Sequence, residues 1–238
     1  MKLFAANWKM YLSDDAAVAL ASEAADAAET ANAEVVIAPG FTGLREVGLA
    51  IHGSKVALAA QDGFWEDKGA YTGEISMAAL AHLEVRYVII GHSERRQYFG
   101  ETDAMVAKKT AAALKAGLTP IVCVGETKEE RDAGQRDDVV RRQLKDGLTG
   151  VDLTHANIVI AYEPRWAIGT GVACAPEDAR ETHRLIHTLV PDGTRVLYGG
   201  SVDPTNIASY IAMREIDGTL VGGASTDATK LRAMLAAF

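Results

Sequence analysis

Eight short runs of mostly apolar residues recur along the chain, and longer amphipathic segments rich in alanine separate them. Within each run the residues at both alternating positions are apolar, which is typical of strands that are buried on both faces. We therefore expect eight strands. The runs are Leu3–Lys9, Val35–Ala38, Val56–Ala60, Tyr87–Ile90, Leu118–Val124, Ile158–Tyr162, Arg195–Tyr198 and Thr219–Val221.

The segments between the runs carry helix signals. Ser13, Asp14 and Asp15 precede Ala16–Thr30, so that the serine can cap a helix and the carboxylates can meet its positive end. Buried strands that alternate with helices predict a parallel α/β sheet covered on both faces. About eight units without a break favour a closed (β/α)8 barrel, with an open doubly wound sheet as the alternative. No linker interrupts the pattern, and we expect one catalytic domain over residues 1–238.

Composition and charge narrow the possible partners. The chain is 48% hydrophobic and 24% charged, which is ordinary for a globular protein, and its net charge of −8 would repel nucleic acid and anionic membranes. The first residues lack the apolar stretch of a signal peptide, and no window is long and apolar enough to span a membrane. We therefore expect a soluble, cytoplasmic protein.

Cysteine and histidine spacing gives no sign of a metal. Cys123 and Cys174 are the only cysteines, and they are far apart and outside any zinc-ligand spacing. His183 and His187 are four residues apart, but they lack a third ligand, and we interpret them as part of a solvated helix face. The sequence predicts neither a disulfide framework nor a metal site.

Functional groups of a parallel barrel lie where its strands end. Glu163 directly follows the apolar run Ile158–Tyr162, where burial would raise its basicity and suit it to abstract a proton beside a carbonyl. A salt-bridged structural glutamate is the alternative. The next residues, Pro164–Gly171, join a proline and glycines to Trp166 and Ile168, which is typical of a lid that excludes water, although a static packed loop has the same composition.

His92 follows another apolar run and stands at the start of a predicted helix, whose N-terminus disfavours a charged imidazole. A neutral ring there can polarise a carbonyl, although a lone histidine is often structural. Asn7 and Lys9 lie one residue apart near the end of the first strand, so that their side chains point to the same side. Lys9 would supply positive charge for a phosphate or an enediolate, unless it is simply a surface lysine.

Glycine turns follow the seventh and eighth runs, at Gly199-Gly200-Ser201 and at Gly222-Gly223. Glycine lets the main chain approach a ligand closely, and barrels of this kind commonly bind phosphate in these two loops. Ordinary turns are the alternative, but two such turns in these positions favour phosphate binding.

Six motifs in chain order resemble the triosephosphate isomerase family, and together they span the sequence. They are NWKM (Asn7–Met10), GHSERRQYFGE (Gly91–Glu101), CVGET (Cys123–Thr127), AYEPRWAIGTG (Ala161–Gly171), YGGSV (Tyr198–Val202) and LVGGAS (Leu220–Ser225). The resemblance implies a TIM barrel that interconverts dihydroxyacetone phosphate and glyceraldehyde 3-phosphate through an enediol or enediolate, in glycolysis and gluconeogenesis, without cofactor or metal.

The resemblance also implies the role of each site residue. Glu163 would move the proton, a neutral His92 would polarise the carbonyl, and Lys9 held by Asn7 would stabilise negative charge. Glu94 would either support these residues without touching the substrate or act as an auxiliary acid. The base and neutral-histidine pairing is the standard description of this enzyme rather than a deduction from the present sequence. The implied phosphate donors are Gly169, Ser201, Gly222 and Gly223, with Ser201 acting through its main-chain N–H.

A homodimer is implied as well, in which the loop Gln61–Ser76 inserts into the partner and places Thr72 near the neighbouring site. The aromatic residues of this long loop are consistent with an interface, although an intrachain packed loop is the alternative. The sequence departs from the family pattern at Gly40, Gly43 and Arg165, of which Arg165 lies in the lid.

Three other functions fit a phosphate-binding barrel less well. A metal-dependent epimerase would need a metal-ligand cluster, and a Schiff-base aldolase would need a lysine where Glu163 stands. A non-catalytic phosphate-binding barrel would have no need of Lys9, His92 and Glu163 together.

Overall fold

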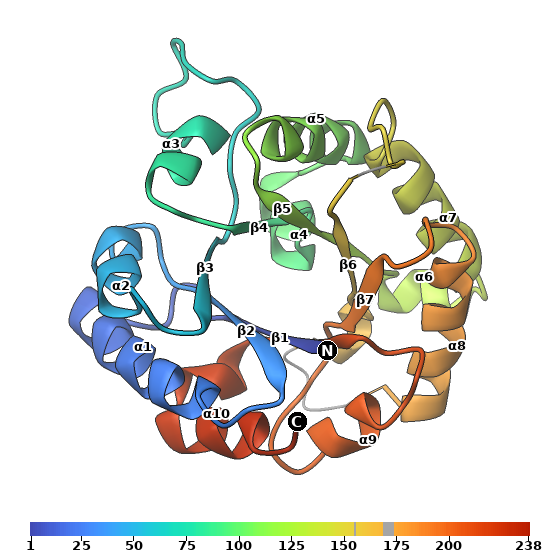
Figure 1. Cartoon of the computed structure of the whole chain (residues 1–238). Helices are drawn as coiled ribbons and strands as arrows, with labels where there is room; N and C mark the ends of the chain where they lie inside the picture. Colours follow the sequence, from blue (N-terminus) through green and yellow to red (C-terminus); the bar gives the residue numbers. More distant parts are fainter. Residues whose placement is uncertain (155, 169–173) are drawn as a thin grey trace.

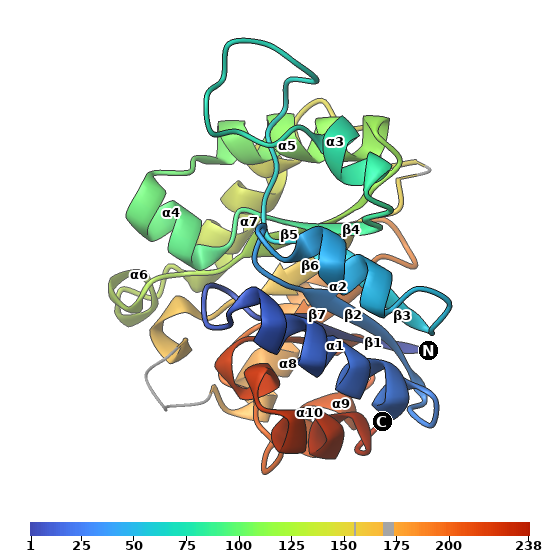
Figure 2. The ribbon, with the colours of Figure 1, turned by 90° about the vertical axis from the view of Figure 1, so that its left-hand side faces the viewer.

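The computed structural model describes residues 1–154, 156–168 and 174–238. Eight parallel strands form a closed barrel in the order β1-β2-β3-β4-β5-β6-β7-β8, and helices surround it (Figures 1 and 2). The predicted (β/α)8 barrel is confirmed, and the open sheet is excluded. The strands are β1 (Lys2–Asn7), β2 (Ala33–Ala38), β3 (Val56–Ala60), β4 (Tyr87–Ile90), β5 (Thr119–Val124), β6 (Val159–Tyr162), β7 (Arg195–Tyr198) and β8 (Gly218–Val221).

The helices alternate with the strands as the pattern predicted. The α-helices are α1 (Asp14–Ala28), α2 (Leu44–Ala50), α3 (Met77–His82), α4 (Ser93–Phe99), α5 (Asp103–Lys115), α6 (Lys128–Asp132), α7 (Arg136–Gly147), α8 (Pro176–His187), α9 (Ile207–Ile211) and α10 (Ala228–Leu235), and the short 3-10 helices are η1 (Arg165–Ala167) and η2 (Gly223–Thr226). Ser13 caps α1 by accepting from the Ala16 N–H at 3.4 Å. Among the described residues, no helix is long and apolar enough to cross a membrane.

Each strand is buried on both faces because it borders two separate hydrophobic clusters. In β1, Phe4 and Ala6 belong to the cluster between strands and helices, whereas Leu3 and Ala5 belong to the cluster inside the barrel. The interior cluster contains many small side chains. Its members are Leu3, Ala5, Val36, Ala38, Ala57, Ala59, Tyr87, Ile89, Ile121, Cys123, Val159, Ala161, Leu197 and Leu220.

The barrel closes where β8 pairs with β1, beginning with Leu3 opposite Gly218. Gly218 has a φ of 151°, and a Cβ there would lie only 1.9 Å from the Leu3 carbonyl oxygen. A side chain at this position would therefore push the two strands apart, so that closure of the ring requires glycine.

Candidate active site

The predicted site residues converge at the carboxyl ends of the strands, around a cavity of about 380 Å³. Asn7 ends β1, His92 follows β4, Glu163 follows β6, and the two glycine turns follow β7 and β8. The cavity wall includes Asn7, Lys9, His92, Glu163, Ser201, Gly222 and Gly223. One cavity thus unites residues that are far apart in the sequence.

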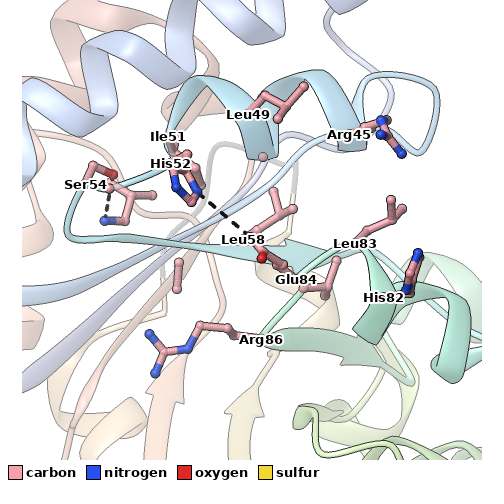
Figure 3. A pocket seen from close by; sticks show the side chains of 15 residues that line it. Arg45, Leu49, Ile51, His52, Ser54, Leu58, His82, Leu83, Glu84 and Arg86 are labelled. Atoms are coloured by element: carbon pink, nitrogen blue, oxygen red, sulfur yellow. Dashed lines mark hydrogen bonds and ion pairs between the residues drawn. The ribbon is translucent and has the colours of Figure 1, made fainter.

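A larger cavity, of about 680 Å³, lies around the starts of β3 and β4 (Figure 3). Arg45 and Arg86 lie on opposite sides of it, and His52 points toward Glu84, 3.9 Å away. These side chains do not converge on a common point. Despite its smaller volume, the cavity at the carboxyl ends is the one whose polar groups are arranged for chemistry.

The Glu163 side chain is buried and held at both carboxylate oxygens. Its Oε1 lies 3.1 Å from His92 Nε2, and its Oε2 accepts the Ser93 N–H at 2.8 Å. Its main chain is fixed as well, because the Glu163 N–H donates to the Val124 carbonyl at 2.7 Å. A Cβ at Gly125 would lie 1.8 Å from the Glu163 carbonyl oxygen, so that only glycine fits beside the start of this segment.

The expectation that burial raises the basicity of Glu163 is wrong for this arrangement. Burial does disfavour the charged carboxylate, but the charge and hydrogen bond of His92, the Ser93 N–H and Lys9 outweigh it, so that the pKa of Glu163 lies below its ordinary value. The sequence showed the apolar surroundings and not these partners. Glu163 must therefore leave His92 and Ser93 before it can act as a strong base.

His92 caps α4 through its ring: Nδ1 accepts the Glu94 N–H at 3.2 Å. Because this acceptor nitrogen carries no proton, the neutral ring has its proton on Nε2, the nitrogen that faces Glu163. Burial lowers the pKa of His92, but the Glu163 carboxylate raises it more, so that the net shift is upward. This upward shift depends on Glu163 remaining in contact with the ring, and it disappears when the carboxylate moves away.

The turn that carries His92 is fixed by two residues that the sequence did not single out as site residues. The Gly91 N–H donates to Glu101 at 3.2 Å, and Arg96 Nε donates to the Gly91 carbonyl at 2.9 Å. Gly91 has a φ of 72°, and a Cβ there would lie 2.9 Å from Val106. The only sequence signal was that Arg96 and Glu101 closely follow the histidine.

Lys9 reaches the cavity from a strained backbone position with a φ of 50°. Its N–H donates to the Asn7 side-chain oxygen at 3.0 Å, and its Nζ lies 2.6 Å from Glu94. Gln61 Nε2 donates to the Lys9 carbonyl at 2.8 Å. Gln61 was missed as a site residue, although its place directly after β3 could have indicated it. A Cβ at Gly222 would lie 3.1 Å from Lys9 Cε, which shows how closely the side chain crosses this turn.

The two glycine turns form the part of the cavity wall that follows β7 and β8. A Cβ at Gly199 would lie 2.9 Å from Glu163 Cγ, so that glycine leaves room for the carboxylate. Ser201 Oγ donates to the Ala167 carbonyl at 2.7 Å, which occupies its hydroxyl proton. Gly222 and Gly223 line the cavity beside it. Gly169 lies outside the described residues.

Comparison with known proteins identifies the family. The family model described as triosephosphate isomerase matches residues 2–238. The chain belongs to the triosephosphate isomerase family. It is 50% identical over 234 residues to the triosephosphate isomerase of Thermoanaerobacter sp. (strain X514), covering 94% of each chain, and 49% identical over 241 residues to that of Moorella thermoacetica, covering 98% of this chain and 97% of the other. The fold also matches a crystal structure of triosephosphate isomerase from Bartonella henselae, with a TM-score of 0.88 and 35% identity over 99% of this chain and 98% of that one.

The described part of the predicted lid is anchored by Glu126. Trp166 Nε1 donates to Glu126 at 2.9 Å, and the Arg165 N–H donates to the Glu126 carbonyl at 3.0 Å. Arg131 lies over the Trp166 ring at 3.7 Å. Burial raises the pKa of Glu126 above its ordinary value. Glu126 lies within the motif CVGET, and nothing in the sequence indicates this contact. The predicted lid residues 169–171 lie outside the described residues.

The loop Gln61–Ser76 projects from the barrel beside α3 (Figures 1 and 2). Phe64 packs on Trp65 and Tyr71, with ring centroids 4.1 and 4.8 Å apart. Tyr71 is 44% exposed, and Thr72 is exposed at the end of the loop. The aromatic cluster gives the loop an internal core while leaving its tip accessible.

The predicted solvated helix face at His183 and His187 is wrong. His183 is completely buried, and its Nδ1 lies 2.7 Å from the Ala179 carbonyl. His187 is half-buried, and its Nε2 lies 2.9 Å from the Glu215 carbonyl. Both rings point toward the protein because this face of α8 packs against the barrel. Among the described residues, no group of three or more potential ligands could hold a metal ion.

Proposed function

We propose that Glu163, His92 and Lys9 form the catalytic centre of this triosephosphate isomerase. The family reaction interconverts dihydroxyacetone phosphate and D-glyceraldehyde 3-phosphate, a step of glycolysis and gluconeogenesis. The observation that supports the assignment is the 3.1 Å contact between His92 Nε2 and Glu163 Oε1 at the wall of a cavity that Lys9 also lines. A base, a hydrogen-bond donor and a positive charge then surround one small ligand.

Glu163 is the base in this proposal. Its carboxylate removes a proton from the carbon next to the carbonyl; the electrons of that C–H bond form a carbon–carbon double bond, and the carbonyl electrons move onto oxygen. The former carbonyl oxygen then takes up a proton, and the hydroxyl on the first carbon gives one up. As that second oxygen forms the new carbonyl, the electrons of the carbon–carbon double bond take the proton back from Glu163 at the neighbouring carbon, which completes the isomerisation. Departure from the Ser93 N–H and from His92 removes the contacts that lower the pKa of Glu163, so that the carboxylate becomes more basic as it reaches the substrate.

His92 and Lys9 stabilise the charge that develops on oxygen. The neutral His92 ring donates its Nε2 proton in a hydrogen bond, and the Lys9 ammonium group supplies positive charge in a site from which water is excluded. Asn7 fixes the main chain of Lys9. Glu94 holds Lys9 Nζ and gives its N–H to His92, so that its role in this proposal is to position both groups.

The phosphate of the substrate binds at the two glycine turns, where the main-chain N–H groups of Ser201, Gly222 and Gly223 are the proposed donors, together with Gly169. Binding of this remote group supplies energy that orients the reacting carbons. The proposed reaction uses no cofactor and no metal.

We further propose that the protein is cytoplasmic, that residues 1–238 form one domain, and that two copies form a homodimer. The exposed tip of the loop Gln61–Ser76 supports the homodimer, with Thr72 contacting the partner. Sedimentation measurements on the wild type and on a variant with a shortened loop would test this part of the proposal.

A coupled assay on the purified protein tests the proposed catalytic centre. We expect turnover of both triose phosphates, and loss of turnover in the variant Glu163→Gln, which keeps the size of the side chain but cannot accept the proton. Glu34→Gln, which changes a carboxylate of β2 that does not line the cavity, is the control for general damage to the fold. Normal turnover by the Glu163→Gln variant would remove this residue from the role of base.

A further inference from the structure

Two stacked tyrosine rings lie behind the phosphate wall of the cavity. Tyr198 is the last residue of β7, and Tyr210 belongs to α9. Their ring centroids are 4.1 Å apart, and their planes differ by 18°. Both side chains are buried, and Tyr210 is absent from the residues that line the cavity. Tyr210 can therefore act on a ligand only through other residues.

The two hydroxyl groups and the main chain of Cys174 form a closed ring of hydrogen bonds. The Cys174 N–H donates to the Tyr198 hydroxyl at 3.3 Å, and the Tyr210 hydroxyl donates to the Cys174 carbonyl at 2.5 Å. The two hydroxyls are hydrogen-bonded to each other as well. Because the only hydroxyl proton of Tyr210 goes to Cys174, the proton between the two tyrosines belongs to Tyr198. Each of these buried polar groups thus has a partner.

This ring supports the glycine turn that forms the cavity wall. A Cβ at Gly200 would lie 2.2 Å from the Tyr198 hydroxyl oxygen, so that the hydroxyl sits directly against the turn. Asn206 directly precedes α9, four residues before Tyr210, and its Nδ2 donates to the Ser201 carbonyl at 3.2 Å. Residues four apart share a helix face. Two residues on the same side of this segment therefore support the turn. Tyr210 acts on Gly200 through Tyr198, and Asn206 binds Ser201 directly.

We propose that Tyr210 is a positioning residue for phosphate binding, which holds the Gly199–Ser201 turn in place through Tyr198 and Cys174. This inference rests on the proposed function of the turn in phosphate binding. It adds a residue that supports phosphate binding without touching the substrate. Main-chain donors bind a phosphate dianion well only when their positions are fixed in advance. Loss of the hydroxyl leaves the Cys174 carbonyl and the Tyr198 proton without partners, and the turn loses its support.

The variant Tyr210→Phe tests the proposal because it keeps the stacked ring and removes only the hydroxyl. We expect the Kd for inorganic phosphate, measured by calorimetry without turnover, to rise about three- to ten-fold, as for the loss of one or two hydrogen bonds. KM for the triose phosphates should rise by a similar factor while kcat changes less, because the lost interaction binds substrate and transition state alike.

Tyr87→Phe is the matched control. Tyr87 is also a buried tyrosine with a hydrogen-bonded hydroxyl, but its partner is Glu34, near the starts of the strands. Both variants should lower the Tm, and only Tyr210→Phe should weaken phosphate binding. A phosphate Kd for Tyr210→Phe within two-fold of the wild-type value, or equal weakening by Tyr87→Phe, overturns the proposal.

A second variant keeps the proposal testable if Tyr210→Phe is poorly folded. Tyr198→Phe breaks the same ring of hydrogen bonds, so that it should also weaken phosphate binding, and the double variant should be little worse than either single variant. Fully additive losses would show that the tyrosines act separately and would contradict the proposal. If the wild type binds phosphate but fails to isomerise triose phosphates, the proposed catalytic centre fails and the role of Tyr210 stands.

Discussion

The two ends of the barrel use charged residues in different ways. Near the strand starts, Glu34 lies 2.6 Å from Arg195, Arg195 donates to the Tyr87 hydroxyl at 3.1 Å, and that hydroxyl donates back to Glu34. At the strand ends, Glu163 binds His92 and the Ser93 N–H, contacts that it breaks in the proposed reaction.

The two ends of the barrel differ in how completely their polar groups are hydrogen-bonded. Every group in the Glu34 cluster has a partner that it can keep permanently. At the strand ends, Lys9 has a positive φ, and Ser93 Oγ is buried without a hydrogen-bond partner among the described residues. Strain and unmet hydrogen bonds of this kind gather at functional sites, where the rest of the fold maintains them. Substitutions at the strand ends should therefore change activity, and those at the strand starts should change stability.

The largest effect is expected from Lys9→Ala at the strand ends. Removal of the ammonium group takes away charge stabilisation in the transition state, so that kcat/KM should fall by at least about 10³-fold. Circular dichroism should show an intact barrel, because the side chain contributes little to the core. Steady-state kinetics gives the answer, and a near-normal kcat/KM would contradict the electrostatic role of Lys9.

As the pH decreases, the contribution of buried His183 to the free energy of unfolding should be lost before that of Glu34 at the strand starts. Burial lowers the pKa of His183 from 6.5 to about 4, so that between these values the unfolded chain binds a proton that the folded chain does not. Stability therefore falls as the pH decreases through this window, by about 3 kcal/mol for the full shift. Urea unfolding at a series of pH values should give a flatter profile for His183→Gln.

Glu34 provides the comparison for this acid effect. Burial would raise the pKa of Glu34, but Tyr87 and Arg195 lower it below 4.5 overall. Its contribution is therefore present above the ordinary pKa and is lost only as the pH falls through the lower folded value. Between pH 6.5 and 4, His183→Gln should flatten the dependence of the unfolding free energy on pH more than Glu34→Gln does. The opposite result would contradict the expected difference between the two regions.

Shortening a glutamate to aspartate should lower kcat at the strand ends and leave kcat unchanged at the strand starts. Glu163→Asp draws the carboxylate back by about 1 Å, and kcat should fall by about 10²-fold with little loss of stability. Glu34→Asp makes the same chemical change at the other end and should leave kcat unaltered. Equal losses of kcat in the two variants would mean that both act through the fold.

The smallest effect is expected from Glu34→Gln at the strand starts. The pair with Arg195 is partly exposed, so that the free energy of unfolding should fall by only about 1 kcal/mol. Urea denaturation measures this change, and phosphate affinity serves as the control. Weaker phosphate binding in this variant would show that the two ends are coupled.

The sequence was sufficient to predict the strands and the residues that follow them, because buried parallel strands have a distinctive apolar pattern and their ends meet on one face. Asn7, His92 and Glu163 could be placed in this way. Residues whose importance depends on a partner could not. Gln61 and Glu126 matter because of their contacts with Lys9 and Trp166, and a sequence does not show which residues come into contact.

Predictions that depended on the direction of a side chain were the least secure. His183 has the spacing of an exposed pair, but its helix turns this face inward against Tyr162 and Tyr198. The pKa of Glu163 could not be predicted either, because apolar neighbours are visible in a sequence and a single N–H at 2.8 Å is not.

The tight fit of Gly218 against Leu3 also has a consequence for how the molecule is made. The first strand has only one neighbour until residues 218–221 exist, and Phe4 then packs edge-on against the ring of Phe238, 5.9 Å away. During translation, before β8 has been synthesised, one edge of β1 has unpaired backbone groups with which another nascent chain could pair. The closed barrel has no such edge, so that pairing of β8 with β1 protects the protein from this kind of aggregation.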